Sequence, residues 1–173
     1  MPATVETRPR VEGGDVARLD AVKGRVLIAD GDARRLARAR DAVRSGQGIQ
    51  ADARTDGATV AYADGTTLEL AGPVRIGRLT EGPAEGPAAA GKVVALERGT
   101  LAVNAARQPK DRPLVFVTPH ARVEVVGTRL TLQVAEDATR VDVVEGRVRV
   151  VAEGRKPVEV GAGELAVAAA GRA

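Results

Sequence analysis

Apolar and charged residues alternate along much of this chain, in short segments that end at glycine, aspartate or proline. In Arg122–Val125 and in Arg147–Val150, valine occupies every second position and charged residues the positions between. Because successive side chains of a β-strand point to opposite faces, this period of two indicates strands with one buried face. The clearest such segments are Ala58–Ala63, Thr66–Ala71, Leu114–Thr118, Ala121–Val126, Thr128–Val134, Arg140–Val144 and Arg147–Ala152.

The pattern predicts an all-β fold with little or no helix: a stack of short strands with tight Gly/Asp corners, either twisted and solenoid-like or an open sandwich. A glycine and one polar residue lead many of the strands. Glycine at such a point supplies a backbone with positive φ, or lets a neighbouring strand approach closely. The intervals are irregular, so this is not a strict repeat. The units begin at Gly24, Gly65, Gly99, Gly127, Gly146 and Gly163.

One segment has a different pattern. Ala33–Ser45 is rich in alanine and arginine, and it places Leu36, Ala39 and Val43 at helical spacing. On pattern alone, this favours a short helix.

The organisation of the chain suggests one domain with a flexible start. Residues 1–14 contain two prolines and paired glycines without periodicity, which predicts a disordered lead-in or linker. Residues 15–170 are expected to form a single domain, because a chain of 173 residues suits one core. The Gly/Pro/Ala-rich stretch Gly82–Gly91 predicts a flexible loop at about residues 80–91, between two halves. A second turn-rich stretch is Ala106–Pro113.

The composition speaks against an enzyme. Cysteine is absent and His120 is the only histidine, so a thiol nucleophile, a histidine dyad or a histidine metal cluster cannot form within one chain. His120 follows Pro119 in a predicted turn, where we expect an exposed or rim position. Asp56 and Asp64 lack the ligand spacing of a known calcium loop. We therefore expect no catalytic residue, no metal site and no cofactor.

Charge and aromatic content limit the partners. The 26 basic residues face 23 acidic ones, for a net charge of +3, and most arginines alternate with acids on expected strand faces. Tyr62 and Phe116 are the only aromatic residues, so the stacking platforms of single-strand binders are missing and no nucleic-acid partner is expected. No run approaches the roughly 20 apolar residues of a membrane span. The chain is either cytoplasmic or a piece of a longer exported or anchored protein.

Taken in order, the glycine-led units resemble those of the FecR family. The resemblance runs from about Asp15 to Val167, and it depends on the ordered set, because a single D-G-T turn is not specific. Its elements are Gly24-Arg25-Val26, Gly46–Ala51, Asp64-Gly65-Thr66, Arg98–Leu101, Pro113–Pro119, Val125–Leu130, Glu145–Val150 and Ala162-Gly163-Glu164.

The resemblance implies a periplasmic or otherwise extracytoplasmic sensor module that acts in protein–protein interaction and signal transduction. In the best-known branch, one membrane helix joins it to a cytoplasmic anti-sigma segment. The outer part receives a signal from the signalling domain of a transporter and so controls an extracytoplasmic-function sigma factor. Here the membrane segment is absent from the chain, and the strand led by Gly99 has no aromatic residue. The resemblance also implies strand or loop, rather than helix, for residues 33–45.

An alternative function is a structural or polysaccharide-binding module of a larger envelope protein, although it is weakened by the missing aromatic residues. For a protein partner, exposed sheet edges offer unpaired backbone groups that another strand can join. We expect the motif residues to shape corners: threonine can bond backbone groups, and glutamate can accept backbone N–H donors. These residues are Gly24, Asp64, Gly65, Thr66, Gly99, Pro119, Gly127, Thr128, Glu145, Gly146, Gly163 and Glu164.

Overall fold

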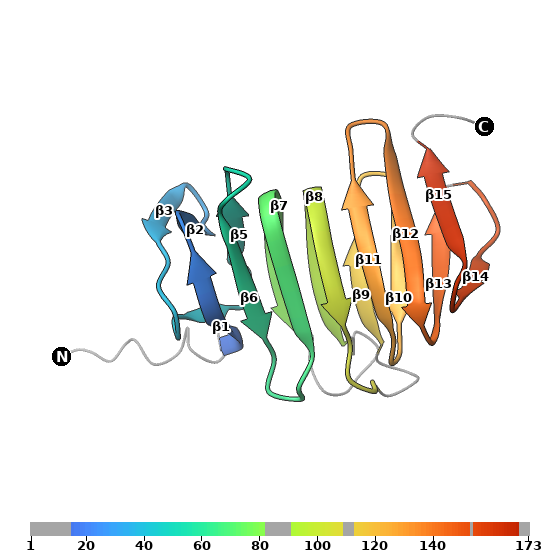
Figure 1. Cartoon of the computed structure of the whole chain (residues 1–173), viewed down its shortest axis with the longest axis horizontal. Coiled ribbons are helices and arrows are strands. Elements are labelled where there is room, and N and C mark those ends of the chain that lie inside the picture. Colours follow the sequence, from blue (N-terminus) through green and yellow to red (C-terminus); the bar gives the residue numbers. More distant parts are fainter. Residues whose placement is uncertain (1–14, 82–90, 109–112, 153, 170–173) are drawn as a thin grey trace.

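The computed structural model describes residues 15–81, 91–108, 113–152 and 154–169, and these contain strands and no helix (Figure 1). The predicted all-β fold is therefore confirmed. The strands are β1 (Asp15–Lys23), β2 (Val26–Asp30), β3 (Ala33–Leu36), β4 (Ala42–Arg44), β5 (Gly48–Ala51), β6 (Gly57–Ala61), β7 (Thr67–Glu81), β8 (Lys92–Asn104), β9 (Leu114–Val117), β10 (Ala121–Val125), β11 (Arg129–Val134), β12 (Ala138–Glu145), β13 (Arg147–Ala152), β14 (Val158–Gly161) and β15 (Leu165–Ala169).

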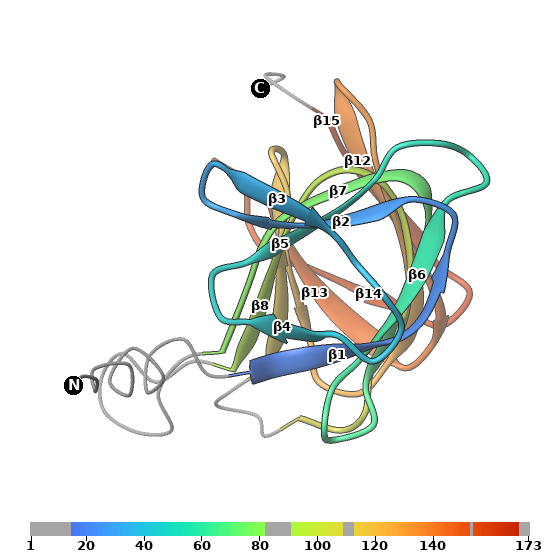
Figure 2. The ribbon, with the colours of Figure 1, turned by 90° about the vertical axis from the view of Figure 1, so that its left-hand side faces the viewer.

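The strands form two layers that share β7 and β8. Layer A has the order β14-β13-β10-β9-β8-β7-β5-β2-β3, and layer B has the order β15-β12-β11-β8-β7-β6-β1-β4. The end view in Figure 2 shows the strands wound around a common interior. Neither layer closes on itself, so β3 and β14 are the edges of layer A, and β4 and β15 are the edges of layer B. The molecule is an open sandwich.

The two longest strands, β7 and β8, join the layers by folding over together. The first part of β7, to Ala71, pairs with β6 of layer B, whereas the part around Ile76 pairs with β5 of layer A. Between them the β7–β8 register is irregular, from Ala71 to Arg75. At this point Gly99 of β8 has a φ of 109°, and a Cβ there would lie 2.7 Å from the Cα of Val74. Only glycine fits such a crossing.

The sequence pattern ended this strand at Ala71, and that boundary was wrong. The strand continues to Glu81, because Gly72 and Pro73 occupy the fold-over and pairing with β8 resumes beyond it. The predicted loop at about residues 80–91 lies mostly outside the described residues. Thr80 and Glu81, at the start of the predicted loop, belong instead to β7, and Glu81 and Lys92 are register partners, so the residues between them join two paired strands.

The interior is aliphatic, as the composition required. Inward-facing side chains alternate with exposed ones, for example along Arg129–Val134, where Leu130, Leu132 and Val134 are buried. Both aromatic residues of the chain are also buried, Phe116 completely and Tyr62 with 4% of its surface exposed. Burial of such alternating faces is the main favourable term in forming the sandwich.

Residues 33–45 form strand, turn and strand rather than the helix that their pattern favoured. The backbone N–H of Ala37 donates to the carbonyl of Val26, and Ala37 is buried while Leu36 is 60% exposed. Asp41 closes the turn by accepting the Arg38 N–H at 2.8 Å. Arg38 donation lowers the pKa of the Asp41 carboxyl. The strand or loop implied by the resemblance is correct. The predicted lead-in, residues 1–14, lies outside the described residues.

Candidate interaction surface

The chain passes between layers at the lower end of Figure 1 through short corners that contain glycine. Residues 126–128 join β10 of layer A to β11 of layer B. Gly146 joins β12 of layer B to β13 of layer A, and residues 162–164 join β14 of layer A to β15 of layer B. Several of the glycine-led units of the sequence are therefore the points where a strand enters the opposite layer.

The corners at Gly127 and Gly146 pack against each other. Gly146 has a φ of 89°, and a Cβ there would lie 2.7 Å from the carbonyl oxygen of Gly127. Gly127 does not have a positive φ, but its Cβ would lie 3.3 Å from the Cα of Arg107. Thr128 is buried, and its hydroxyl donates to the carbonyl of Arg147 at 3.0 Å. This hydrogen bond ties the two corners together.

The two motif glutamates differ in their contacts. Glu164 accepts the backbone N–H of Gly161 at 2.7 Å, in the turn that contains Gly163 at a φ of 81°. Glu145 is exposed, and its carboxylate has no hydrogen-bond partner in the described part of the chain. Backbone capping by a glutamate is therefore seen at Glu164 and not at Glu145.

The D-G-T turn belongs to a polar cluster that holds the layers together at the lower end. Asp64 accepts the Thr66 N–H at 2.9 Å and the side-chain amide of Gln108 at 2.8 Å, and it pairs with Lys92 at 3.1 Å. Burial alone would raise the pKa of the Asp64 carboxyl, but the donors from Gln108, Thr66 and Lys92 outweigh it and lower the pKa to about 2. We call this cluster of Asp64, Thr66, Lys92 and Gln108 the charged clasp. Gly65 completes the turn with a φ of 96°.

Tyr62 lies beneath this clasp. The ammonium of Lys92 is 5.6 Å from the centroid of the Tyr62 ring. The phenol oxygen is buried and has no hydrogen-bond partner among the described residues, and burial raises the pKa of the Tyr62 hydroxyl. Lys92 and Gln108 were not singled out from the sequence, because Gln108 and Asp64 are 44 residues apart and nothing local links them.

The corner at Gly24 is held by Asp56. Gly24 has a φ of 68°, and Asp56 accepts the backbone N–H groups of Arg25 at 3.0 Å and Ala53 at 3.1 Å. These donors, Arg25 first, lower the pKa of the Asp56 carboxyl. The Asp56 carboxylate, which was considered above as a calcium ligand, thus accepts hydrogen bonds from the backbone. Across the described ranges, no group of three or more acidic or histidine side chains is placed to hold a metal ion.

His120 is buried, so its expected exposed or rim position was wrong. The turn after Pro119 folds the ring inward, where Nδ1 lies 2.8 Å from the hydroxyl of Thr139 on β12. Nε2 lies 3.2 Å from the carbonyl of Glu136 and donates to it, since a carbonyl only accepts. The hydroxyls of Thr118 and Thr139 are 2.8 Å apart and complete the network. It joins the β9–β10 turn to layer B.

The four edge strands differ in charge. β3 carries Arg34 and Arg35, β4 carries Arg44, and β14 carries Glu159, whereas β15 has no charged residue. Charges on an edge discourage pairing with another chain. The β14–β15 end is also apolar: Val158, Leu165 and Val167 are 54%, 48% and 60% exposed. We call β14 and β15 together the C-terminal edge.

A family model described as FecR protein matches residues 49–149, more than half of the chain. The chain belongs to the FecR family. This match includes the D-G-T turn and the corners at Gly127 and Gly146, while Gly24 and Gly163 lie outside it. FecR proteins are regulatory, and their FecR domains are typically periplasmic parts of membrane regulators. Within the described residues, no helix is long and apolar enough to cross a membrane.

Solved structures show the same fold. The chain is similar to a candidate anti-sigma factor from Parabacteroides distasonis ATCC 8503, whose crystal structures have resolutions of 1.65 and 2.50 Å. Each superposes with a TM-score of 0.57, at 20% and 21% identity, over 69% of this chain and 53% of that chain. This FecR domain therefore spans about half the length of that protein. No curated protein matches the chain.

Proposed function

We propose that this FecR domain is the non-catalytic, extracytoplasmic sensor part of a transmembrane regulator. It binds a protein partner, the signalling domain of an outer-membrane transporter, and thereby controls an extracytoplasmic-function sigma factor. Membership of a regulatory family supports the sensor role, and the likeness to a candidate anti-sigma factor supports the sigma-factor link.

The edge of β15 is the observation that carries the proposal. Its outer edge has no strand partner among the described residues, and its five residues, Leu165–Ala169, are uncharged. An unpaired edge lets a partner strand gain main-chain hydrogen bonds, while exposed side chains add apolar contact. Leu165 and Val167 supply that contact. At the opposite end of the sandwich, the arginines of β3 and β4 make pairing with a partner strand less favourable.

A polysaccharide-binding role gains no support from this surface. Sugar-binding sites generally stack a sugar face on an exposed aromatic ring, and the only two aromatic residues of the chain, Tyr62 and Phe116, are buried. The depressions on the outer face of layer B, as around Thr131 and Arg140, are lined instead by polar, charged and aliphatic side chains, and none of their lining residues is aromatic. Protein binding fits the exposed groups better.

A charge placed on the edge tests this function. In the full-length protein, Val167→Lys should weaken binding of the transporter's signalling domain about tenfold or more and abolish induction of a sigma-dependent reporter, because lysine blunts an edge. The matched control is Val144→Lys on β12, a strand with partners on both sides, where the valine is 58% exposed. Equal effects of the two variants, or none from either, would count against the proposal.

The proposed location has its own test. Alkaline phosphatase fused after residue 169 of the full-length protein should be active in intact cells, since it folds to an active enzyme only outside the cytoplasm. A fusion that is produced at normal level but inactive would place the domain inside the cell.

A further inference from the structure

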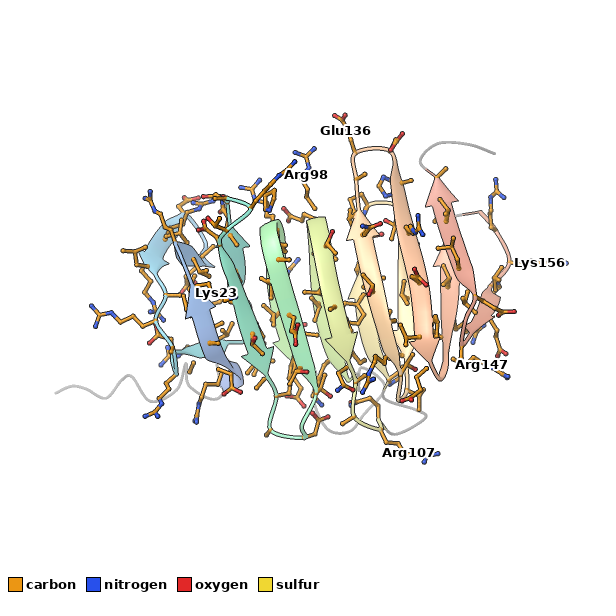
Figure 3. All side chains as sticks on the ribbon, in the orientation of Figure 1. Lys23, Arg98, Arg107, Glu136, Arg147 and Lys156 are labelled. Atoms are coloured by element: carbon orange, nitrogen blue, oxygen red, sulfur yellow. The ribbon has the colours of Figure 1, made fainter. Side chains whose placement is uncertain are left out.

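Three arginines line a depression of about 460 Å³ at the lower end of the molecule. Arg107 follows β8, Arg129 begins β11 and Arg147 begins β13. Asn104, Thr128 and Glu145 complete the polar lining. Figure 3 labels Arg107 and Arg147 at this end of the molecule. Segments far apart in the sequence thus place three arginine residues around one depression.

The depression has an excess of positive charge. Arg107 and Arg129 have no ion-pair partner within the described ranges, although Glu145 is the register partner of Arg129. Arg147 lies 3.4 Å from Glu159, but these side chains are 70% and 67% exposed. An exposed pair of this kind is worth little and exchanges readily for another partner. The residues that line the depression therefore include three arginines and a single acidic residue, Glu145.

The floor of the depression is fixed by the corners beneath it. Gly127, which has no side chain, and the buried Thr128 are among the residues that line it. The hydroxyl of Thr128 is bound to the carbonyl of Arg147, which holds the start of β13 in place. The backbone positions of the arginines are thus set before any ligand arrives, and pre-organisation of this kind favours binding.

We propose that this depression binds an acidic segment of a protein partner, with carboxylates paired to Arg107, Arg129 and Arg147. Guanidinium groups bind carboxylates through paired, charge-assisted hydrogen bonds. Asn104 and Glu145 have no hydrogen-bond partner among the described residues, and both offer acceptor oxygens. A polypeptide supplies N–H donors for these acceptors as well as carboxylates for the arginines, whereas a phosphate supplies acceptors only. That the ligand is a segment of a protein rests on the proposed function.

The depression lies beside the C-terminal edge. Arg147 is the register partner of Gly161, which ends β14 just before the turn into β15. Glu145 is three residues along β12 from Asp142, the register partner of Leu165, a spacing of roughly 10 Å. One partner can therefore add a strand to β15 and place acidic residues in the depression.

Titration of the 173-residue chain with the blocked peptide Ac-Gly-Glu-Asp-Glu-Gly-NH2, followed by the Nε–H signals of arginine in NMR spectra, tests this site. The signals of Arg107, Arg129 and Arg147 should shift, and the matched peptide Ac-Gly-Gln-Asn-Gln-Gly-NH2 should shift none. Arg129→Gln should weaken binding about tenfold, as expected for loss of a charge-assisted hydrogen bond. The control Arg122→Gln, which removes an exposed arginine of β10, should leave it unchanged.

The variant Glu145→Gln is expected to change the affinity for the acidic peptide in the opposite direction. It removes the only negative charge of the lining, so affinity for the acidic peptide should rise about two- to fivefold. Equal binding of the two peptides, equal losses in Arg129→Gln and Arg122→Gln, or weaker binding by Glu145→Gln would overturn the site. Tighter, Arg129-dependent binding of inorganic phosphate or of phosphatidylglycerol vesicles would overturn the assignment to a peptide. Val167→Lys should not affect the peptide titration, so failure of the edge proposal is distinguishable from failure of this one.

Discussion

Single glycines occupy corners and turns of this fold, and glycine is needed there for two different physical reasons. Gly146 combines a φ of 89° with a close approach to Gly127, whereas Gly154 has a φ of 73° and open space where a Cβ would stand. Gly127 lacks the positive φ and depends on its closeness to Arg107 alone. A Gly127→Val change is therefore expected to cost about 1–3 kcal/mol through crowding rather than through a forbidden backbone conformation.

Comparing Gly146→Ala with Gly154→Ala separates the two reasons. Both changes put a Cβ on a left-handed backbone, which costs about 1–2 kcal/mol, but only Gly146→Ala also forces a carbonyl oxygen away. We expect Gly146→Ala to destabilise the domain by at least about 1 kcal/mol more than Gly154→Ala, measured by urea unfolding. Equal losses in the two variants would show that close packing of the corners does not matter.

Because of Asp64 in the charged clasp, the free energy of unfolding of the domain depends on pH in the acidic range. The folded pKa of Asp64, about 2, lies below its ordinary value of 3.8, so its contribution is complete above about pH 4 and is lost as the pH falls toward 2. We expect Asp64→Asn to cost about 1–2 kcal/mol at pH 7, with a difference from the unmodified chain that shrinks toward zero near pH 2. Urea unfolding of both proteins across this range measures it, and a constant difference would contradict the account.

At the scale of elements, alternation of side chains predicted the strands well. Segments such as Ala121–Val126 and Arg147–Ala152 agree with β10 and β13 to within a residue, because each has one buried face. The continuation of β7 beyond Gly72 was missed, since a glycine and a proline inside a strand are indistinguishable from a turn by sequence. The helical spacing in residues 33–45 misled, because tertiary pairing with β2 and β1 overrode local propensity.

The candidate sites were harder to predict than the strands. The motif glycines indicated corners, but which corners meet depends on the two-layer topology. Arg107, Arg129 and Arg147 come together only because three crossings lie at one end of the sandwich. Likewise, the burial of His120 requires Thr139 of β12, which is 19 residues away. The alternation of apolar and polar residues indicates which face of a strand is buried, but it does not show which residues of other strands lie beside that strand.

The topology predicts a gradient of local stability among the strands. β8 pairs with β7, β9 and β11, whereas β3, β4, β14 and β15 each pair with one strand. Amides of β7 and β8 should therefore exchange with solvent slowest and those of the four edge strands fastest, by about a hundredfold or more. Hydrogen exchange of the isolated domain measures this directly. Protection of β15 equal to that of β8 would mean that its edge is already covered.

The whole molecule is an open sandwich whose two ends differ. Arginines mark the β3–β4 end, while the β14–β15 end combines an uncharged edge with a neighbouring basic depression. β7 and β8 belong to both layers and hold the sandwich together between these ends. In the proposed function, the β14–β15 end is the one that the partner binds.

Hydrogen exchange of this FecR domain, with and without the purified signalling domain of the proposed transporter partner, tests whether a partner binds at the edge of β15. We expect slower exchange in residues 165–169 on binding, with a smaller effect in residues 158–161 and none in β3 or β4. Binding that instead protects β3 and β4, or that leaves residues 165–169 unchanged, would contradict it.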